Sequence, residues 1–262
     1  MEEESMKFKK VTAVYFSATG TNKTTVCTIA SGISETYDIM DLTKYDSIKE
    51  EKEFLEDEIV VIGAPVYAGR IYEGALHRFL NLRGNNTPCV ITATYGNRHY
   101  DDALLELKVF MENQGFIPIA AAATIGEHTY GSIQVGRPDK DDQEEDLQFA
   151  KKVVEKIESN SVFDKLEVPG NYPYREGGTG GVFRPLTLDS CNRCGLCASA
   201  CPEGAISLDD CKTIDNDKCI ACFRCIRICP KHAKNMDTPE YNDFAEKFSI
   251  KLSKKRKNEY YL

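Results

Sequence analysis

Two short cysteine-rich segments constrain the fold of this chain more than any other feature of its sequence. The first repeat begins at Cys191 and the second at Cys219. Both read C-x2-C-x2-C-x3-C-P, and each cysteine of the second repeat follows its counterpart by 28 residues. Of the other cysteines, Cys27 and Cys89 lie far from the repeats. This spacing predicts metal or redox chemistry rather than a disulfide framework.

The spacing within each repeat suits a four-iron cluster. Three cysteines at intervals of three residues can wrap one face of a [4Fe-4S] cube, while the fourth, which precedes proline, points away. Zinc is the alternative metal, but zinc usually takes four ligands as two separated C-x2-C pairs, which leaves the third and fourth cysteines of both repeats unexplained. The sequence therefore predicts two [4Fe-4S] clusters.

In tandem repeats of this kind, the fourth cysteine of one repeat ligates the cluster of the other repeat. This crossed pattern predicts two ligand sets. They are Cys191, Cys194, Cys197 and Cys229 for one cluster, and Cys219, Cys222, Cys225 and Cys201 for the other. Residues 186–238 resemble the bacterial two-cluster ferredoxins, a small α+β fold. Cys211 fits neither set, and we expect it to be an unligated thiol.

Several basic residues stand among these cysteines, and two interpretations of them remain open. They are either solvated loop charges or groups that offset the negative charge of the clusters and raise their reduction potential. They are Arg193, Lys218, Arg224, Arg227 and Lys231.

The charge and hydropathy of the chain exclude several classes of function. The net charge of −8 argues against nucleic acid as the main partner. The first ten residues, MEEESMKFKK, are charged and lack the apolar region of a secretory signal. No apolar run approaches the roughly 20 residues that a membrane span needs. We therefore expect a soluble, cytoplasmic protein with no membrane span.

Residues 10–160 alternate between short apolar runs and longer amphipathic ones. The runs 10–17, 58–67, 88–95 and 116–125 are typical of buried strands, and 36–42 is a weaker strand. Helices are predicted between them, at 21–34, 70–82, 100–114 and 139–159. Strands that alternate with helices predict a parallel sheet covered on both faces, which binds ligands beyond the carboxyl ends of its strands.

Three loops at this predicted ligand edge carry suitable side chains. The first, 17–25 (SATGTNKTT), offers hydroxyls and backbone N–H groups at a helix N-terminus, where phosphate binds. It is neither a Walker A loop nor a G-x-G-x-x-G loop, so a dinucleotide is not indicated. Taken alone, a hydroxyl-rich turn before a helix is more often a plain helix cap. The loops 64–72 and 92–102 each place tyrosine and glycine just beyond a strand, which suits a flat aromatic ligand.

With these loops in place, residues 10–160 resemble a flavodoxin, whose phosphate loop runs Ser/Thr-x-Thr-Gly-x-Thr. Ser17, Thr19, Gly20 and Thr21 match that loop, and Asn22 stands where a flavodoxin usually has threonine. The resemblance implies a five-stranded parallel sheet and bound FMN. It also implies three groups of FMN-binding residues. They are Ser17, Ala18, Thr19, Gly20, Thr21 and Asn22 for the phosphate, and Pro65, Val66, Tyr67, Ala68, Gly69, Thr94, Tyr95, Gly96, Asn97 and Tyr100 for the ring.

Taken together, residues 10–238 are similar to the bacterial and archaeal flavodoxin–ferredoxin fusion proteins. We predict an FMN-binding domain at 1–160, a Gly/Pro-rich linker at 161–185, the two-cluster domain at 186–238, and an amphipathic helix with a basic tail at 239–262. Thr238 and Pro239 form the helix-start signal. The basic tail could recruit an acidic partner, but a solvated helix face is the simpler interpretation.

The predicted function is electron transfer between FMN, the two clusters and a redox partner. The alternative is a flavin-dependent reductase of a small-molecule acceptor that is fed through the clusters. That alternative needs a pocket over the flavin, and the long loop 125–142, with Glu127, His128 and Tyr130, is placed to shape one. Surface variation is the simpler explanation of this loop. No catalytic Ser/His/Asp group is apparent. The expected partner is a redox protein or a small-molecule acceptor, and the sequence predicts no oligomeric state.

Overall fold

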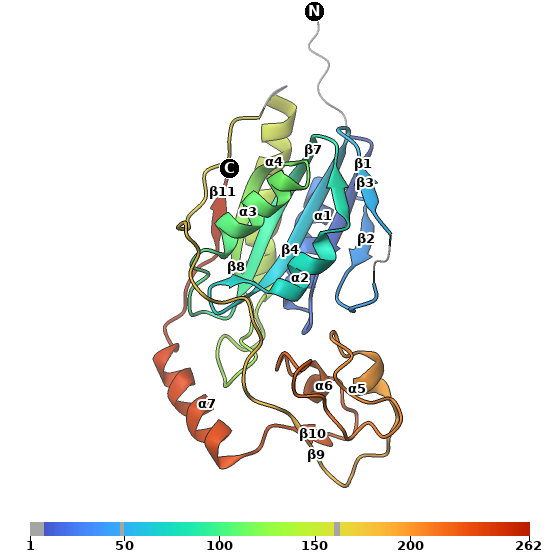
Figure 1. Cartoon of the computed structure of the whole chain (residues 1–262). Coiled ribbons are helices and arrows are strands. Elements are labelled where there is room, and N and C mark those ends of the chain that lie inside the picture. The colour runs from blue at the N-terminus through green and yellow to red at the C-terminus, as the bar shows by residue number, and fades with distance from the viewer. Residues whose placement is uncertain (1–7, 48–49, 160–162) are drawn as a thin grey trace, which may run out of the picture.

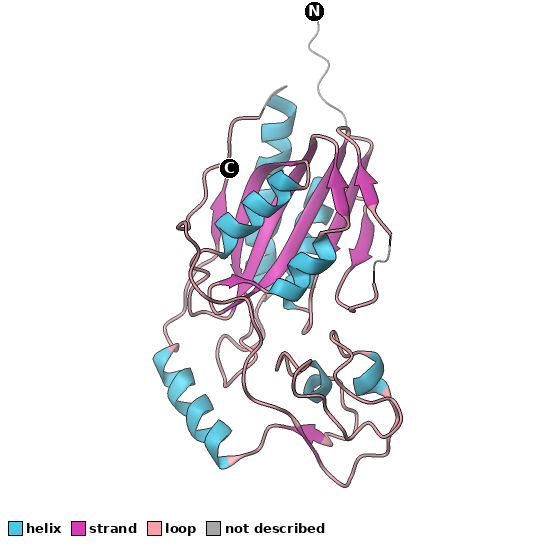
Figure 2. Ribbon diagram, viewed as in Figure 1, coloured by secondary structure: helices cyan, strands magenta, loops and turns pink. Residues whose placement is uncertain are grey.

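The computed structural model describes residues 8–47, 50–159 and 163–262. The predicted boundary between domain and linker at 160–161 therefore lies outside the described residues. The N-terminal part is a sheet with helices on both faces. The cysteine segment lies beyond the carboxyl ends of the parallel strands (Figures 1 and 2). No helix within the described ranges is long and apolar enough to cross a membrane.

The five predicted strands form the parallel core of the sheet. They are β1 (Lys10–Tyr15), β2 (Asp38–Asp41), β4 (Glu58–Tyr67), β7 (Thr87–Tyr95) and β8 (Phe116–Ile125). Their spatial order is β2-β1-β4-β7-β8, and each neighbouring pair is parallel. Counted along the chain this order is 2-1-3-4-5, which is the flavodoxin order, with its ligand site at the β1/β4 switch point. The predicted fold class is therefore confirmed.

Two apolar cores cover the faces of the sheet, because side chains alternate along each strand. Helices α1 (Thr21–Ile33) and α4 (Lys140–Ser159) pack on one face, where Val26 and Phe149 are buried. Helices α2 (Glu73–Phe79) and α3 (Ala103–Asn113) pack on the other.

Several short strands were not predicted from the sequence. The predicted helix 70–82 is wrong at both ends: residues Arg70–Ile71 form β5, antiparallel to β4, and Leu82–Gly84 form β6, which pairs with β3 (Lys52–Phe54). Ala68 and Gly69, with φ of 52° and 89°, form the tight turn that returns the chain from β4 to β5. Such a turn with two positive φ angles favours a hairpin over a helix.

The cysteine segment is a small module with little regular structure. It contains the helices α5 (Leu196–Ser199) and α6 (Arg224–Arg227) and the antiparallel pair β9 (Leu186–Thr187) and β10 (Lys234–Asn235). The glycine-rich segment 168–185 leads to it as a packed arm rather than a free linker. The backbone N–H groups of Asn171 and Arg175 donate to Asp102, and that of Gly178 donates to Tyr67 O at 2.8 Å.

The chain then returns to the sheet. Helix α7 (Pro239–Lys251) begins where predicted, with the Thr238 hydroxyl accepting a hydrogen bond from Tyr241 N. Beyond it, β11 (Glu259–Tyr261) pairs antiparallel with β8 and forms the edge of the sheet (Figure 1). This strand was missed in the sequence, where residues 239–262 were interpreted as a helix and a basic tail.

Candidate cofactor sites

The loop between β1 and α1 presents a run of free backbone donors. Among the described residues, none of the N–H groups from position 18 to position 22 has an acceptor. The loop is held on both sides: Ser17 N donates to Thr43 Oγ1 at 3.0 Å, and Ser17 Oγ accepts from Lys23 N at 2.9 Å. Gly20, at φ 93°, turns the chain into the helix. Unsatisfied N–H groups at a helix N-terminus make a cradle that fits a phosphate.

Asn22 supports this loop from below. Its side chain is buried, with Nδ2 donating to Phe16 O at 3.0 Å and Oδ1 accepting from Thr94 Oγ1 at 2.9 Å. A Cβ atom at Gly63 would stand 2.7 Å from that same Oδ1, so only glycine leaves room for it. The residue that departs from the flavodoxin loop pattern thus ties the loop to β7, two strands away from β1.

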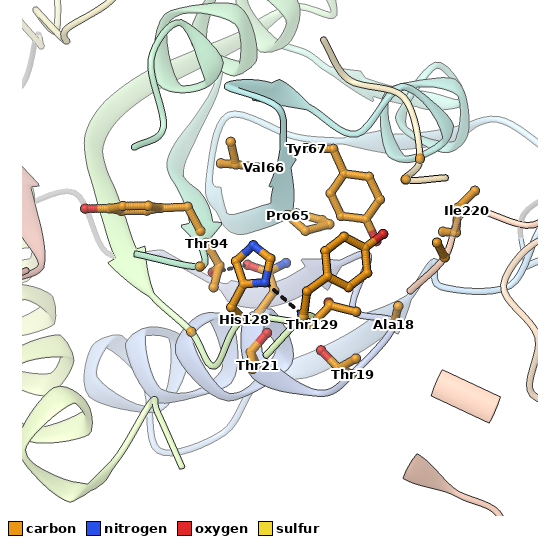
Figure 3. Close-up of a pocket in the computed structure, with 18 of the residues that line it drawn as sticks. Ala18, Thr19, Thr21, Pro65, Val66, Tyr67, Thr94, His128, Thr129 and Ile220 are labelled. Carbon is orange, nitrogen blue, oxygen red and sulfur yellow. Dashed lines mark hydrogen bonds between the residues drawn. The ribbon is translucent and has the colours of Figure 1, made fainter. Parts of the chain in front are cut away.

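A cavity of about 290 Å³ lies at the carboxyl ends of the strands, close to the lower limit of typical ligand pockets. We call it the main cavity. The three predicted loops and the loop after β8 line it together with the arm and the second repeat. In the view of Figure 3, Thr94 and Ile220 stand at opposite sides of it. The lining residues from the predicted loops are Ser17, Ala18, Thr19, Thr21, Asn22, Pro65, Val66, Tyr67, Ala68, Thr94, Tyr95 and Gly96.

Glycines let the walls of the main cavity approach one another. A Cβ at Gly96 would stand 2.2 Å from His128 Cδ2, and a Cβ at Gly181 would stand 1.8 Å from Tyr130 Oη. Residues 126–130 all line the cavity, so the long loop after β8 reaches the site as the sequence suggested. Tyr130 in turn contacts the rings of Phe223 and Tyr241, which joins this loop to the second repeat and to α7.

His128 is a neutral hydrogen-bonding group in this cavity. Burial lowers the pKa of His128 to about 4. Its Nδ1 accepts a hydrogen bond from Tyr130 N at 2.8 Å, so in the neutral ring Nε2 carries the proton. His128 therefore offers a donor without a charge (Figure 3).

Four predicted ring- or phosphate-site residues do not line the main cavity. Gly20 and Gly69 are turn residues with positive φ. Asn97 instead holds the C-terminal segment: its Nδ2 donates to Leu252 O and Lys254 O, and its Oδ1 accepts from Arg256 N. Tyr100 is buried, with its Oη 2.8 Å from Glu259 Oε2. Tyr100 thus contacts β11, the strand that the sequence did not reveal, and Asn97 contacts the segment that leads to it.

The eight motif cysteines line two further, smaller cavities. The first cysteine cavity is lined by Cys191, Cys194, Cys197 and Cys229, together with Cys211. The second cysteine cavity is lined by Cys219, Cys222, Cys225 and Cys201. The motif cysteines in each cavity are those that the crossed pattern assigns to one cluster. Within the described ranges, no three or more His, Cys, Asp or Glu side chains form a ready site for a single metal ion.

The two repeats fold alike at their fourth cysteines. Ala205 N donates to Cys201 Sγ at 3.3 Å, and Ala233 N donates to Cys229 Sγ at 3.2 Å. Donors to sulfur stabilise a thiolate ligand and raise the potential of a bound cluster. Burial raises the pKa of Cys222 and of Cys225 to about 12, so their deprotonation depends on a bound metal.

The predicted basic residues differ in whether they lie beside a cysteine cavity, where they could offset the charge of a cluster. Lys231 lines the first cysteine cavity, and Arg224 lines the second. Arg227 instead pairs with Glu127, with Nη2 2.8 Å from Oε1. Lys234, which the sequence did not single out, lines the first cavity and is buried, with its Nζ 2.6 Å from Thr187 Oγ1.

The second repeat lines the main cavity of the flavodoxin-like part, whereas the start of the first repeat faces solvent. Ile220 and Ala221 line the main cavity, and Ile220 also lines the second cysteine cavity. In the first repeat Cys194 is exposed, and Leu196 is 49% exposed. The sequence analysis missed Ile220, Ala221 and the arm residues 179–181. The available signal was the apolar pair 220–221 standing where the first repeat has the polar pair 192–193.

Comparison with known proteins identifies the cysteine module. Residues 190–233 match the family model described as the 4Fe-4S dicluster domain. The chain thus fits a flavodoxin–ferredoxin fusion. No curated protein matches the chain significantly.

Several flavoproteins of known structure resemble the N-terminal part of the chain. A flavodoxin from the domain Archaea matches with 16% identity and a TM-score of 0.37, covering 56% of this chain and 98% of that one. Oxidised flavodoxin 1 from Bacillus cereus matches with 16% identity and a TM-score of 0.40, over 56% of this chain and 98% of that one. Rubredoxin oxygen:oxidoreductase from Desulfovibrio gigas has 16% identity and a TM-score of 0.42, covering 60% of this chain but only 38% of its own. Because these TM-scores are low, the assignment of the fold is based on the strand order of the sheet.

Proposed function

We propose that this fusion protein is an electron carrier that holds FMN and two [4Fe-4S] clusters and passes electrons between them and a redox partner. The observation that carries the proposal is the position of Ile220, which lines both the main cavity and the second cysteine cavity. A single residue thus belongs to the walls of both sites. When bound, FMN exchanges two electrons or one, and each cluster exchanges one.

The main cavity supports FMN rather than a dinucleotide. The free N–H groups at positions 18–22 and the Thr19 and Thr21 hydroxyls would hold its single phosphate. Val66, Tyr67, Tyr95 and the neutral His128 are placed to contact its ring. Because His128 is uncharged, it would not offset the negative charge that the ring gains on reduction. This favours a low reduction potential for the flavin.

The two cysteine cavities support two clusters with crossed ligation. Cys219, Cys222, Cys225 and Cys201 would hold the cluster beside the main cavity, and the other four motif cysteines would hold the second. Cys201 and Cys225 pack against the same small apolar cluster that contains Cys197. The two cavities are therefore neighbours, as centres that exchange electrons must be.

The first repeat is the end that would meet a partner. Its Cys194 is exposed, and the exposed side chains of Leu188, Leu196 and Leu208 belong to the same module. Short apolar side chains around an exposed centre favour a protein partner, because apolar area is what a docking partner removes from water. A reducing compartment such as the cytoplasm suits thiolate ligands.

The first experiment is an anaerobic spectrum with iron and flavin analysis. We expect about eight irons and about one FMN per chain. Zinc in place of iron, or the absence of flavin from protein incubated with FMN, would remove the corresponding half of the proposal.

The second experiment follows flavin reduction by a one-electron protein donor. Cys222→Ser should slow this reduction at least tenfold, because it removes the centre nearest the main cavity. An unchanged rate would contradict the proposed order of centres. Rapid steady-state turnover of quinones or nitro compounds by the wild type would instead support the reductase alternative.

A further inference from the structure

The two repeats differ at the residue before their third cysteine. The first repeat has Leu196 there, and the second has Arg224. Leu196 is 49% exposed, whereas Arg224 reaches out of the cysteine module to the loop between β1 and α1. The repeats share a fold, so this difference reflects what the second repeat touches.

Arg224 donates hydrogen bonds to two carbonyl groups of the loop whose N–H groups form the phosphate cradle. Its Nη1 lies 2.7 Å from Ala18 O and 3.3 Å from Ser17 O. In a planar trans peptide the C=O and the following N–H point in opposite directions. Holding these two carbonyls therefore turns the N–H groups of Ala18 and Thr19 away from Arg224. Both N–H groups belong to the run that has no acceptor in the described part of the chain.

The same side chain lies beside the second cysteine cavity. Arg224 lines that cavity, and it stands between Cys222 and Cys225 in the sequence. Its Nε is buried and has no acceptor among the described residues. A partly buried guanidinium whose buried Nε donor is unused is costly unless a negative charge is near. Both expected ligands, a phosphate group and a four-thiolate cluster, are anions.

We infer that Arg224 is a positioning residue that couples FMN binding to the cluster of the second repeat. Ligation of Cys222 and Cys225 fixes the short helix α6, and thereby fixes the guanidinium that shapes the phosphate cradle. FMN then binds more tightly when this cluster is present, and bound FMN stabilises the cluster in return, because coupling between two binding equilibria is reciprocal. The inference rests on the proposed function, since it requires both cofactors.

The first test measures FMN affinity by flavin fluorescence in the complete, cluster-loaded protein. Arg224→Leu, which copies the first repeat, should raise the Kd of FMN about tenfold or more, because a charge-assisted hydrogen-bond pair is lost. Arg224→Lys should fall between this variant and the wild type, because lysine keeps the charge but not the planar fork. Lys218→Leu is the matched control, since Lys218 precedes the first cysteine of the same repeat but is exposed and pairs with Asp215 instead; the Kd of FMN for this variant should stay within about twofold.

Iron content and the far-ultraviolet circular dichroism of each variant show whether it has folded and loaded its clusters. A folded, fully loaded Arg224→Leu variant with the Kd of the wild type would overturn the inference. A variant that fails to load is replaced by Arg224→Lys or Arg224→Gln, to which the same criterion applies.

The second test reads the coupling from the cluster side. A strong iron chelator is added with and without saturating FMN, and the loss of cluster absorbance is followed. FMN should slow the loss of about half of the iron in the wild type, and this protection should be absent in Arg224→Leu, which a merely structural role would not predict. Equal protection in both proteins would overturn the inference. A wild type that binds no FMN would instead defeat the proposed function itself.

Discussion

Arg78 and Glu203 form an ion pair across the junction between the flavodoxin-like part and the cysteine module, with Nη2 3.0 Å from Oε1. The pair is mostly buried, with 8% of the arginine side chain and 18% of the glutamate side chain exposed. Tyr72 Oη donates to the same carboxylate at 2.8 Å, and Arg78 also donates to Pro202 O. Because Glu203 follows Cys201 by two residues, this junction anchors a predicted ligand of the docked cluster.

Glu203→Gln should destabilise the protein by about 3 kcal/mol, because it leaves the buried Arg78 without its counter-charge. The measurement is anaerobic denaturant unfolding of the loaded protein. The control is Asp243→Asn, which breaks the exposed pair with Lys247 and should change stability by less than about 1 kcal/mol. Equal effects of the two substitutions would show that the junction contributes little to stability.

Crossed ligation can be tested with two double variants. If Cys201 and Cys219 bind the same cluster, Cys201→Ser combined with Cys219→Ser removes one cluster and leaves about four irons per chain. Cys201→Ser combined with Cys191→Ser then removes both clusters. Uncrossed ligation predicts the reverse pattern. Iron analysis and low-temperature electron paramagnetic resonance of the reduced proteins distinguish the two.

The partly buried His128 makes stability depend on pH. Because burial lowers its pKa from 6.5 to about 4, the unfolded chain takes up the proton first as the pH falls. The contribution of the neutral ring is complete above pH 6.5 and is lost between about 6.5 and 4. From pH 7 to pH 5.5 the wild type should lose about 1 kcal/mol more than His128→Gln does. His77→Gln, at an exposed position, is the control and should follow the wild type.

Asn97 holds the C-terminal segment on the sheet. Asn97→Ala removes its three hydrogen bonds to residues 252–256 and leaves alanine at a φ of 65°, which asparagine tolerates better. Trypsin should cut after Lys254, Lys255 and Lys257 at least tenfold faster in this variant, as followed by mass spectrometry. Asn113→Ala, on the exposed end of α3, should leave these rates unchanged. If both variants were cut alike, the segment would be held by β11 alone.

The parallel core was predictable because its strands are continuous apolar runs. FIPIAAAATI, the sequence of β8, is buried along nearly its whole length, so no period of two or of 3.6 had to be resolved. Once the order of strands and helices was known, the loops after β1, β4 and β7 had to meet at one edge. That is why Ser17, Tyr67 and Thr94 were correctly expected to lie together.

The prediction lost accuracy a few residues beyond each strand end. Asn97 and Tyr100 belong to the loop after β7, but a positive φ at Asn97 turns the chain toward the C-terminal segment. Their partners lie more than 150 residues away in the sequence, as the bond from Asn97 to Arg256 shows. No local sequence pattern predicts a contact between residues so far apart in the chain.

The docking of the cysteine module is likewise a long-range feature. Local spacing was enough to predict which motif cysteines line each cysteine cavity. Which repeat faces the main cavity depends on the surface of another part of the chain. The contrast between Ile220 and its exposed counterpart Asn192 was visible in the sequence, but its meaning required the structure.

The pairing of β11 with β8 makes the sheet sensitive to incomplete synthesis. Because β11 follows both repeats in the chain, the edge of β8 stays open until residues 259–261 have been translated. That edge belongs to an apolar strand rich in alanine and isoleucine, and an open apolar edge invites pairing with another chain. Chains that stop before residue 259 should therefore aggregate through β8, even when both cysteine repeats are intact.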